Sequence, residues 1–124
     1  VQIMEDLRKE QLEALQAMLD YIPKLRKGME TVAKELSGER LADTNEYLKK
    51  VIEGLNWVIE VYNGTSSLIN EKENNLDKDA INKACIDFSD AYKNGDSTAQ
   101  AMLLTGALAA FITDFENAAN AVIA

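Results

Sequence analysis

Few side chains in this sequence are able to carry out chemistry. The only cysteine, Cys85, lies between Ile81 and Phe88 on the apolar face of a predicted helix. A reactive thiol needs a neighbouring cation or imidazole to lower its pKa, but that face has no Lys or Arg and the chain has no His. We therefore expect Cys85 to be a structural thiol buried in the core.

Pairs of carboxylates occur at helical spacing, as Asp87 with Asp90 and as Glu53 with Glu60. They project from polar helix faces, where no burial raises a carboxyl pKa toward the value that a general acid needs. The absence of His also removes the commonest general base and a usual ligand of zinc. The sequence therefore predicts no catalytic residue, no cofactor and no enzyme activity.

One acidic run could attract a cation, but it lacks the alternating oxygen ligands and the central glycine of a calcium loop. We expect a solvated turn there and no metal site. The run comprises Glu71, Glu73, Asp77 and Asp79.

A candidate partner surface lies beside the main apolar stripe of the second predicted helix. Tyr47, Gly54, Trp57 and Val61 fall on this flank, and they widen the apolar surface beyond what one neighbouring helix covers. Trp57 sits at the edge of the flank, close to polar residues, where an amphipathic indole suits a partner surface. The alternative is that Trp57 packs against the N-terminal half of the first helix, or against the third helix, of the same chain.

The elements that carry these residues are predicted to be helices. The 124 residues include one Pro, show no strand-like alternation and place apolar residues three and four apart, which indicates an all-α fold. In the first helix the apolar positions continue across Pro23. This predicts one helix of about 50 Å that is kinked near Pro23, with the bend at Leu19 and Asp20. Gly38 is expected to stop it in the left-handed conformation.

The second helix is predicted to begin near Leu41. It either ends at Gly64 or continues to Lys72, which would bury two further apolar residues. Asp77 is the expected N-cap of the third helix, and Gly95 is expected to close that helix.

The final helix is predicted to follow a cap at Asp96 or Ser97. Between residues 101 and 112 it is apolar nearly all round, so it should lie at the centre of the bundle or in a subunit interface. Gly106 is expected to let another helix approach closely. We predict an antiparallel four-helix bundle formed by a single domain, residues 1–124.

The sequence also contains an internal repeat. Residues 21–38 and 47–64 share the pattern YxxKxxxG, followed by apolar positions and a further glycine, at an offset of 26 residues. Six matches at one offset suggest duplication. A missing side chain permits tight helix approach, so Gly28 and Gly54 are expected to face each other.

The charge of the chain limits its partners. It has 13 Lys and Arg against 21 Asp and Glu, a net charge of −8, which is the wrong sign for nucleic acid or an anionic membrane. The charge-free stretch 97–113 is shorter than the roughly 20 residues of a membrane span. A single cysteine requires no oxidising compartment, so we expect a cytoplasmic protein.

The chain resembles a small acidic helical domain of unknown function from Gram-positive bacteria of the clostridial and bacillus type. The resemblance covers residues 20–124 and is carried by three segments: the unit 21–38, the stretch IEGLNWVIE at 52–60, and the NGD turn at 94–96. The final helix is less acidic here than is usual in that family. The resemblance implies the helical fold and a bacterial cytosolic setting, and it transfers no site.

Together these features predict a non-enzymatic helical interaction module that forms a homodimer. The alternative is a secretion-type or flagellar-type chaperone, in which a short acidic bundle offers an apolar groove to an amphipathic helix of its client.

Overall fold

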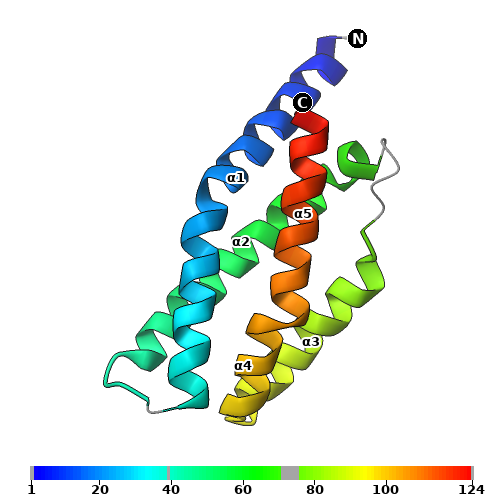
Figure 1. Cartoon of the computed structure of the whole chain (residues 1–124). Coiled ribbons are helices and arrows are strands. Elements are labelled where there is room, and N and C mark those ends of the chain that lie inside the picture. The colour runs from blue at the N-terminus through cyan, green and yellow to red at the C-terminus, as the bar shows by residue number, and fades with distance from the viewer. Residues whose placement is uncertain (1, 39, 71–75, 124) are drawn as a thin grey trace.

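The computed structural model describes residues 2–38, 40–70 and 76–123, and every regular element in these ranges is a helix (Figure 1). The prediction of an all-α fold is confirmed. α4 and α5 lie end to end and form one rod that is interrupted at Gly106. When this rod is counted as one helix, the described residues form a bundle of four helices. The elements are α1 (Gln2–Ser37), α2 (Thr44–Asn70), α3 (Lys78–Lys93), α4 (Ser97–Thr105) and α5 (Ala107–Ile123).

The first helix is as long as its apolar pattern predicts. α1 continues through Pro23 without interruption, and the kink at that residue stays a prediction. Its first turns project past the other helices (Figure 1), so Leu7 is 55% exposed. The prediction for Gly38 is wrong, because Gly95 is the one glycine with a positive φ, at 66°. α1 therefore ends at Ser37 without a left-handed glycine.

α2 begins three residues later than predicted, because Thr44 organises the turn before it. The Thr44 hydroxyl accepts a hydrogen bond from the Leu41 backbone N–H at 2.8 Å and donates one to Glu35 Oε1 at 2.7 Å. Thr44 is buried while Leu41 is exposed. The hydroxyl thus satisfies a backbone donor that would otherwise lack a partner at the helix start.

At its other end α2 does not stop at Gly64 but continues to Asn70. The continuation buries Leu68 and Ile69, which explains why the longer of the two predicted helices forms. Gln11 of α1 donates from Nε2 to the Gly64 carbonyl at 3.1 Å. Residues 71–75, which include Glu71 and Glu73 of the acidic run, lie outside the described residues.

The caps of the last helices follow the sequence prediction. The Asp77 carboxylate accepts from the Ala80 N–H at 3.1 Å, and the Asp96 carboxylate accepts from the Ala99 N–H at 3.1 Å. Gly95 closes the turn between the two helices. Each cap satisfies one of the N–H groups that a helix N-terminus leaves unpaired.

Gly106 has a different role from the predicted one. A Cβ at this position would lie 2.8 Å from the Met102 carbonyl oxygen and would meet no atom of another helix. Its φ of −107° and ψ of −101° interrupt the helix. The prediction that Gly106 admits a second helix is therefore wrong, and the residue instead separates α4 from α5.

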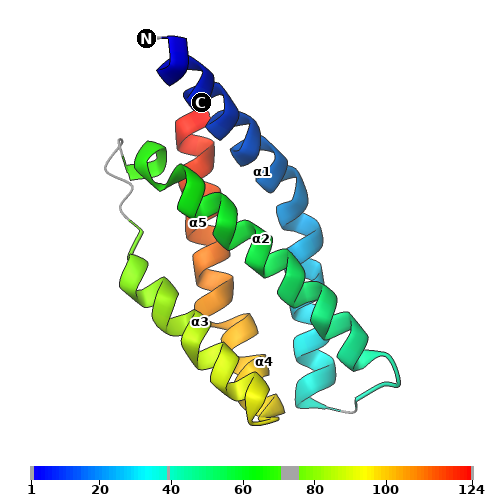
Figure 2. The same ribbon diagram turned by 180° about the vertical axis from the view of Figure 1, so that it is seen from behind.

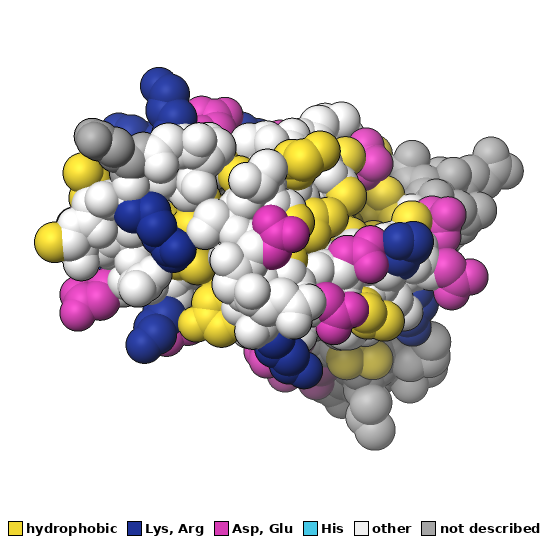
Figure 3. Space-filling model, turned by 90° about the horizontal axis from the view of Figure 1, so that it is seen from below, with side chains coloured by type: hydrophobic (Ala, Val, Ile, Leu, Met, Phe, Trp, Pro, Cys, Tyr) yellow, Lys and Arg dark blue, Asp and Glu magenta, His cyan; other side chains and the backbone are white. Residues whose placement is uncertain are grey.

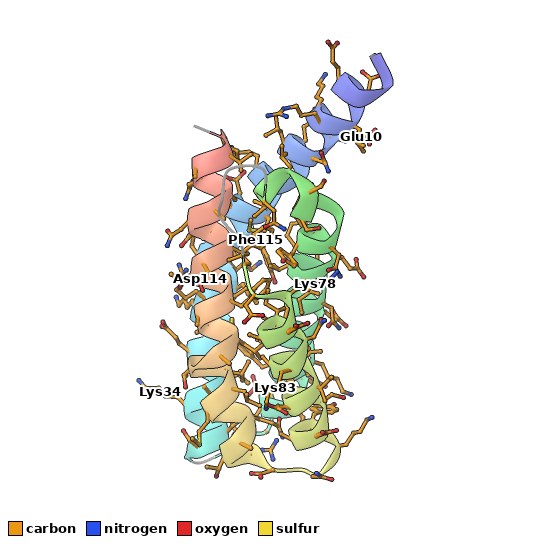
Figure 4. All side chains as sticks on the ribbon, turned by 90° about the vertical axis from the view of Figure 1, so that its right-hand side faces the viewer. Glu10, Lys34, Lys78, Lys83, Asp114 and Phe115 are labelled. Carbon is orange, nitrogen blue, oxygen red and sulfur yellow. The ribbon has the colours of Figure 1, made fainter. Side chains whose placement is uncertain are left out.

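An aromatic cluster forms the centre of the core. Tyr62 of α2 meets Phe111 and Phe115 of α5 edge to face, with ring centroids 5.7 and 5.4 Å apart. Figure 4 shows Phe115 between the helices, whereas Glu10 lies on the projecting start of α1. Such edge-to-face pairs add to the stabilisation from burial.

The rod formed by α4 and α5 contacts the other three helices. It is not enclosed on every side, since Met102 is 69% exposed. By length and composition alone, Ser97–Ile123 is the one helix in the described ranges that could cross a membrane, a property that the core helix of a soluble protein shares. The expectation that the chain has no membrane span stays a prediction.

Candidate functional site

The helices α2 and α3 diverge from each other on one side of the bundle. In the described part of the chain no Cα of α2 lies within 8 Å of a Cα of α3, and α3 makes its helix contacts with α4 and α5. Figure 2 shows the two helices spreading apart in front of α5. In a four-helix bundle, neighbouring helices normally pack with their axes about 8 to 10 Å apart, and this contact closes each side of the bundle.

The opening between them is a groove of about 410 Å³. Apolar side chains from three helices form most of its wall, and Lys49 and Glu53 stand at its edge. A volume on this scale falls within the range of about 300 to 1,000 Å³ that binding pockets occupy. The apolar lining residues are Ile52, Leu55 and Ile59 of α2, Phe88 and Tyr92 of α3, and Leu108 of α5.

Cys85 lines the same groove and is half-buried. The prediction of a thiol enclosed in the core is therefore only partly correct, because one side of the residue borders the opening. Burial raises the pKa of the Cys85 thiol, so the thiol stays protonated at neutral pH and is a poor nucleophile.

Tyr92 shows why the sequence did not reveal this groove. Its spacing on α3 predicts a core position, yet it is 43% exposed, because α2 does not reach it. The only available signal was the apolar surface of α2, which is wider than one neighbour covers. The predicted partner surface, which includes Gly54 and Trp57, lies on the opposite flank of that helix.

The predicted partner surface lies on the other side of α2, facing α1. A Cβ at Gly54 would collide with the hydroxyl of Tyr21, and Tyr47 approaches Gly28. Trp57 meets Tyr21 edge to face with ring centroids 5.6 Å apart and is 37% exposed. Val61 is half-buried. The structure therefore places Trp57 against the middle of the first helix, which matches the alternative arrangement only in part, and its role as a partner anchor stays a prediction.

The two repeat units pair reciprocally at the crossing of α1 and α2. Tyr21 of the first unit lies over Gly54 of the second, and Tyr47 of the second unit lies over Gly28 of the first. The expectation that Gly28 and Gly54 face each other is wrong. The atoms nearest to a Cβ at Gly28 belong to Val51 and Tyr47, and those nearest to a Cβ at Gly54 belong to Tyr21 and Leu25. Each missing side chain accommodates an aromatic ring instead of a second glycine.

The carboxylates do not form a reactive site. Glu53, Glu60 and Asp90 are exposed. Asp87 accepts a hydrogen bond from Lys83 Nζ at 2.7 Å, and this bond raises the pKa of Lys83. No three His, Cys, Asp or Glu residues are grouped to hold a metal ion anywhere in the described ranges.

Hydrophobic side chains also reach the surface at the end of the bundle that holds the α1–α2 and α3–α4 connections. There they form separate patches among Lys, Arg, Asp and Glu (Figure 3). These separate patches do not form a second site comparable with the groove.

Comparison with known protein families assigns most of the chain to one of them. A family model described as a domain of unknown function, DUF8042, matches residues 13–118. No curated protein and no solved structure matches the chain. The match agrees with the resemblance to a domain of unknown function, while the Gram-positive origin stays a prediction.

Proposed function

The chain belongs to the DUF8042 family of domains of unknown function, and we propose that it is a non-enzymatic helical interaction module that binds an apolar helix of a partner protein between α2 and α3. The observation that carries this proposal is the separation of these two helices over an apolar groove of about 410 Å³.

The dimensions of the groove support a helical occupant. Its α2 wall extends from Lys49 to Ile59, which at a rise of about 1.5 Å per residue corresponds to about 15 Å, or nearly three turns. An amphipathic helix presents apolar residues at i, i+3, i+4 and i+7 over this length. Such a helix would contact Ile52, Phe88 and Leu108 and would fill the place where a fully closed bundle has a helix contact.

The absence of activated groups in the described residues supports a binding role over catalysis. The thiol of Cys85 is not activated, because burial raises its pKa instead of lowering it. Glu53, the one carboxylate among the residues that line the groove, stands at its exposed edge. Because the net charge is −8, we also propose that the chain binds neither nucleic acid nor an anionic membrane. Because its single cysteine requires no oxidising compartment, we propose that it is cytoplasmic.

We also propose one specific version of this role, a secretion-type or flagellar-type chaperone, which is compatible with the same groove. In that case the helix in the groove belongs to an export substrate that is unstable when free. A chaperone should remain bound to its client during purification, whereas a module that only self-associates should purify without one.

A direct test uses Cys85 as a reporter, because it is the only thiol in the chain and it lines the groove. The probe is a synthetic 14-residue helix with Leu at i, i+3, i+4 and i+7 and Lys on its polar face. We expect it to slow the reaction of Cys85 with dithionitrobenzoate at least tenfold. Equal rates with and without about 1 mM helix, a concentration that reveals even weak binding, contradict the proposal.

A matched pair of variants controls for non-specific binding. Ile52→Gln places an amide in the groove wall, whereas Met102→Gln makes a similar change on the exposed face of α4. We expect the first substitution to weaken protection of Cys85 and the second to leave it unchanged. Equal effects of the two variants would assign the binding to general surface attraction.

A further inference from the structure

We propose that a second copy of the chain binds the outer face of α3, so that two α3 helices pack side by side in opposite directions around a two-fold axis at Ile86. This inference deepens the proposed interaction role by naming one partner and its surface. This face uses other residues than those that line the groove, so an experiment can contradict one proposal and leave the other standing.

The first observation is the exposure of Ile86. It lies in the middle of α3 and is 61% exposed, although the other apolar residues of that helix face the bundle or the groove. In the described residues α3 makes its helix contacts only with α4 and α5, so its outer face is open. One exposed isoleucine alone is ordinary, and the charges around it supply the second observation.

Asp79, Ile86 and Lys93 are spaced seven residues apart and lie on one line along α3. All three are exposed. When two copies of this line meet in opposite directions at Ile86, Asp79 of each copy lies opposite Lys93 of the other. The contact has an apolar centre with an ion pair at either end.

A second pair of charges has the same symmetry. Lys83 and Asp90 lie on one side of this line and are exposed, and in the same arrangement Lys83 of each copy lies near Asp90 of the other. Lys83 already donates to Asp87 of its own helix, but an ammonium group has three hydrogens to donate. The two-fold contact therefore contains four pairs of opposite charges.

The orientation follows from the same charges. If two α3 helices packed in the same direction, Asp79 would meet Asp79, and Lys93 would meet Lys93, so the contact would be repulsive. α3 carries three Lys and three Asp, in a chain with a net charge of −8. The helix is therefore locally neutral, so the net charge of the chain opposes contact less at this face than elsewhere, and the opposite charges that meet across the two-fold axis favour it.

Charge reversal tests the register of this contact by sedimentation over a range of protein concentrations. Lys93→Asp places Asp opposite Asp at both ends, so we expect the association constant to fall at least tenfold. Asp79→Lys should have the same effect. The double variant Asp79→Lys with Lys93→Asp restores opposite charges and should recover the dimer.

Lys34→Asp is the matched control, because it makes the same charge change on an exposed residue of α1 and should leave the association constant unchanged. The proposal is overturned if the chain is monomeric at every concentration, if Lys93→Asp and the control have equal effects, or if the double variant does not recover.

A cross-link tests the position of the axis independently of charge. In a Cys85→Ser background, Ile86→Cys brings two thiols together at the two-fold axis, so mild oxidation should give a disulfide-linked dimer. Met102→Cys in the same background should give no disulfide-linked dimer, because Met102 lies on α4, away from the proposed axis. Equal cross-linking of the two variants would exclude the axis at Ile86.

These results separate the two proposals. A monomer whose Cys85 is protected by the synthetic helix retains the groove function and excludes the α3 contact. A dimer that responds to charge reversal, but whose Cys85 the helix does not protect, supports the α3 contact and excludes the groove as a helix-binding site.

Discussion

The hydroxyl of Tyr21 lies in the space that a side chain at Gly54 would occupy. The second repeat unit places Tyr47 over Gly28 less tightly, since the nearest Tyr47 atom, Cε1, would lie 3.6 Å from a Cβ at Gly28. The α1–α2 crossing therefore depends on two glycines inside helices, where glycine costs about 1 kcal/mol relative to alanine. Close packing of two aromatic rings offsets that cost.

Gly54→Ala should lower the free energy of unfolding by about 1 to 2 kcal/mol, because overpacking outweighs the gain in helix propensity. Gly28→Ala should cost less, since the nearest atom, Val51 Cγ2, would lie 3.3 Å away. Urea unfolding measures both.

Gly64 provides the control for this series, because it is inside α2 and no atom lies within 4 Å of a Cβ built there. Gly64→Ala should therefore stabilise the chain by about 0.5 to 1 kcal/mol. If the three alanine variants have equal effects, the tyrosine contacts do not explain the glycines.

Phe115→Ala should lower the free energy of unfolding by about 3 to 5 kcal/mol, because the ring is fully buried and its loss leaves a cavity. It contacts Tyr62 and stacks on Phe111 with ring centroids 5.8 Å apart. Thermal and urea unfolding measure the loss. Met102→Ala, on the exposed face of α4, should change stability by less than about 0.5 kcal/mol.

The N-caps of α3 and α4 should contribute similar amounts of stability. Asp77→Ala and Asp96→Ala each remove the carboxylate that accepts a backbone N–H, which should cost about 1 kcal/mol. Asparagine at either position keeps an acceptor and should recover most of the loss, as urea unfolding will show. An asparagine variant as unstable as the alanine variant would assign the effect to charge instead of capping.

The stability of the chain should fall at alkaline pH partly through Cys85. Burial raises the pKa of its thiol above the ordinary value of 9.0, so folding favours the protonated form. This contribution to stability is fully present below pH 9.0 and is lost as the pH rises through the raised pKa. Thiolate absorbance against pH measures the shift, and Cys85→Ser should show a shallower fall in stability above pH 9.0.

The helices themselves were predictable because their signals are local. The spacing of apolar residues from Ile22 to Leu36 and from Leu104 to Val122 fixes which faces are buried, and Asp77 and Asp96 mark helix starts by their side-chain chemistry. Phe111 and Phe115 belong to the second of these series, and both are buried.

The pairing of helix faces was less predictable. The repeat identified Gly28 and Gly54 as positions of close approach, but the register of α1 against α2 decides that each meets a tyrosine. At Gly106 the local backbone interrupts the helix, although the apolar pattern continues across it. A periodic pattern reports which residues avoid water and carries no information on which neighbour covers them.

The sequence by itself therefore determined the all-α class, the length of α1, the N-caps of α3 and α4 and most of the buried stripe, because these depend on interactions between residues a few positions apart. Only the tertiary structure decided that α2 and α3 separate and leave Cys85 and Tyr92 on a groove. That separation depends on how side chains from α1, α4 and α5 fill the space between the helices, a balance of packing among residues far apart in the chain.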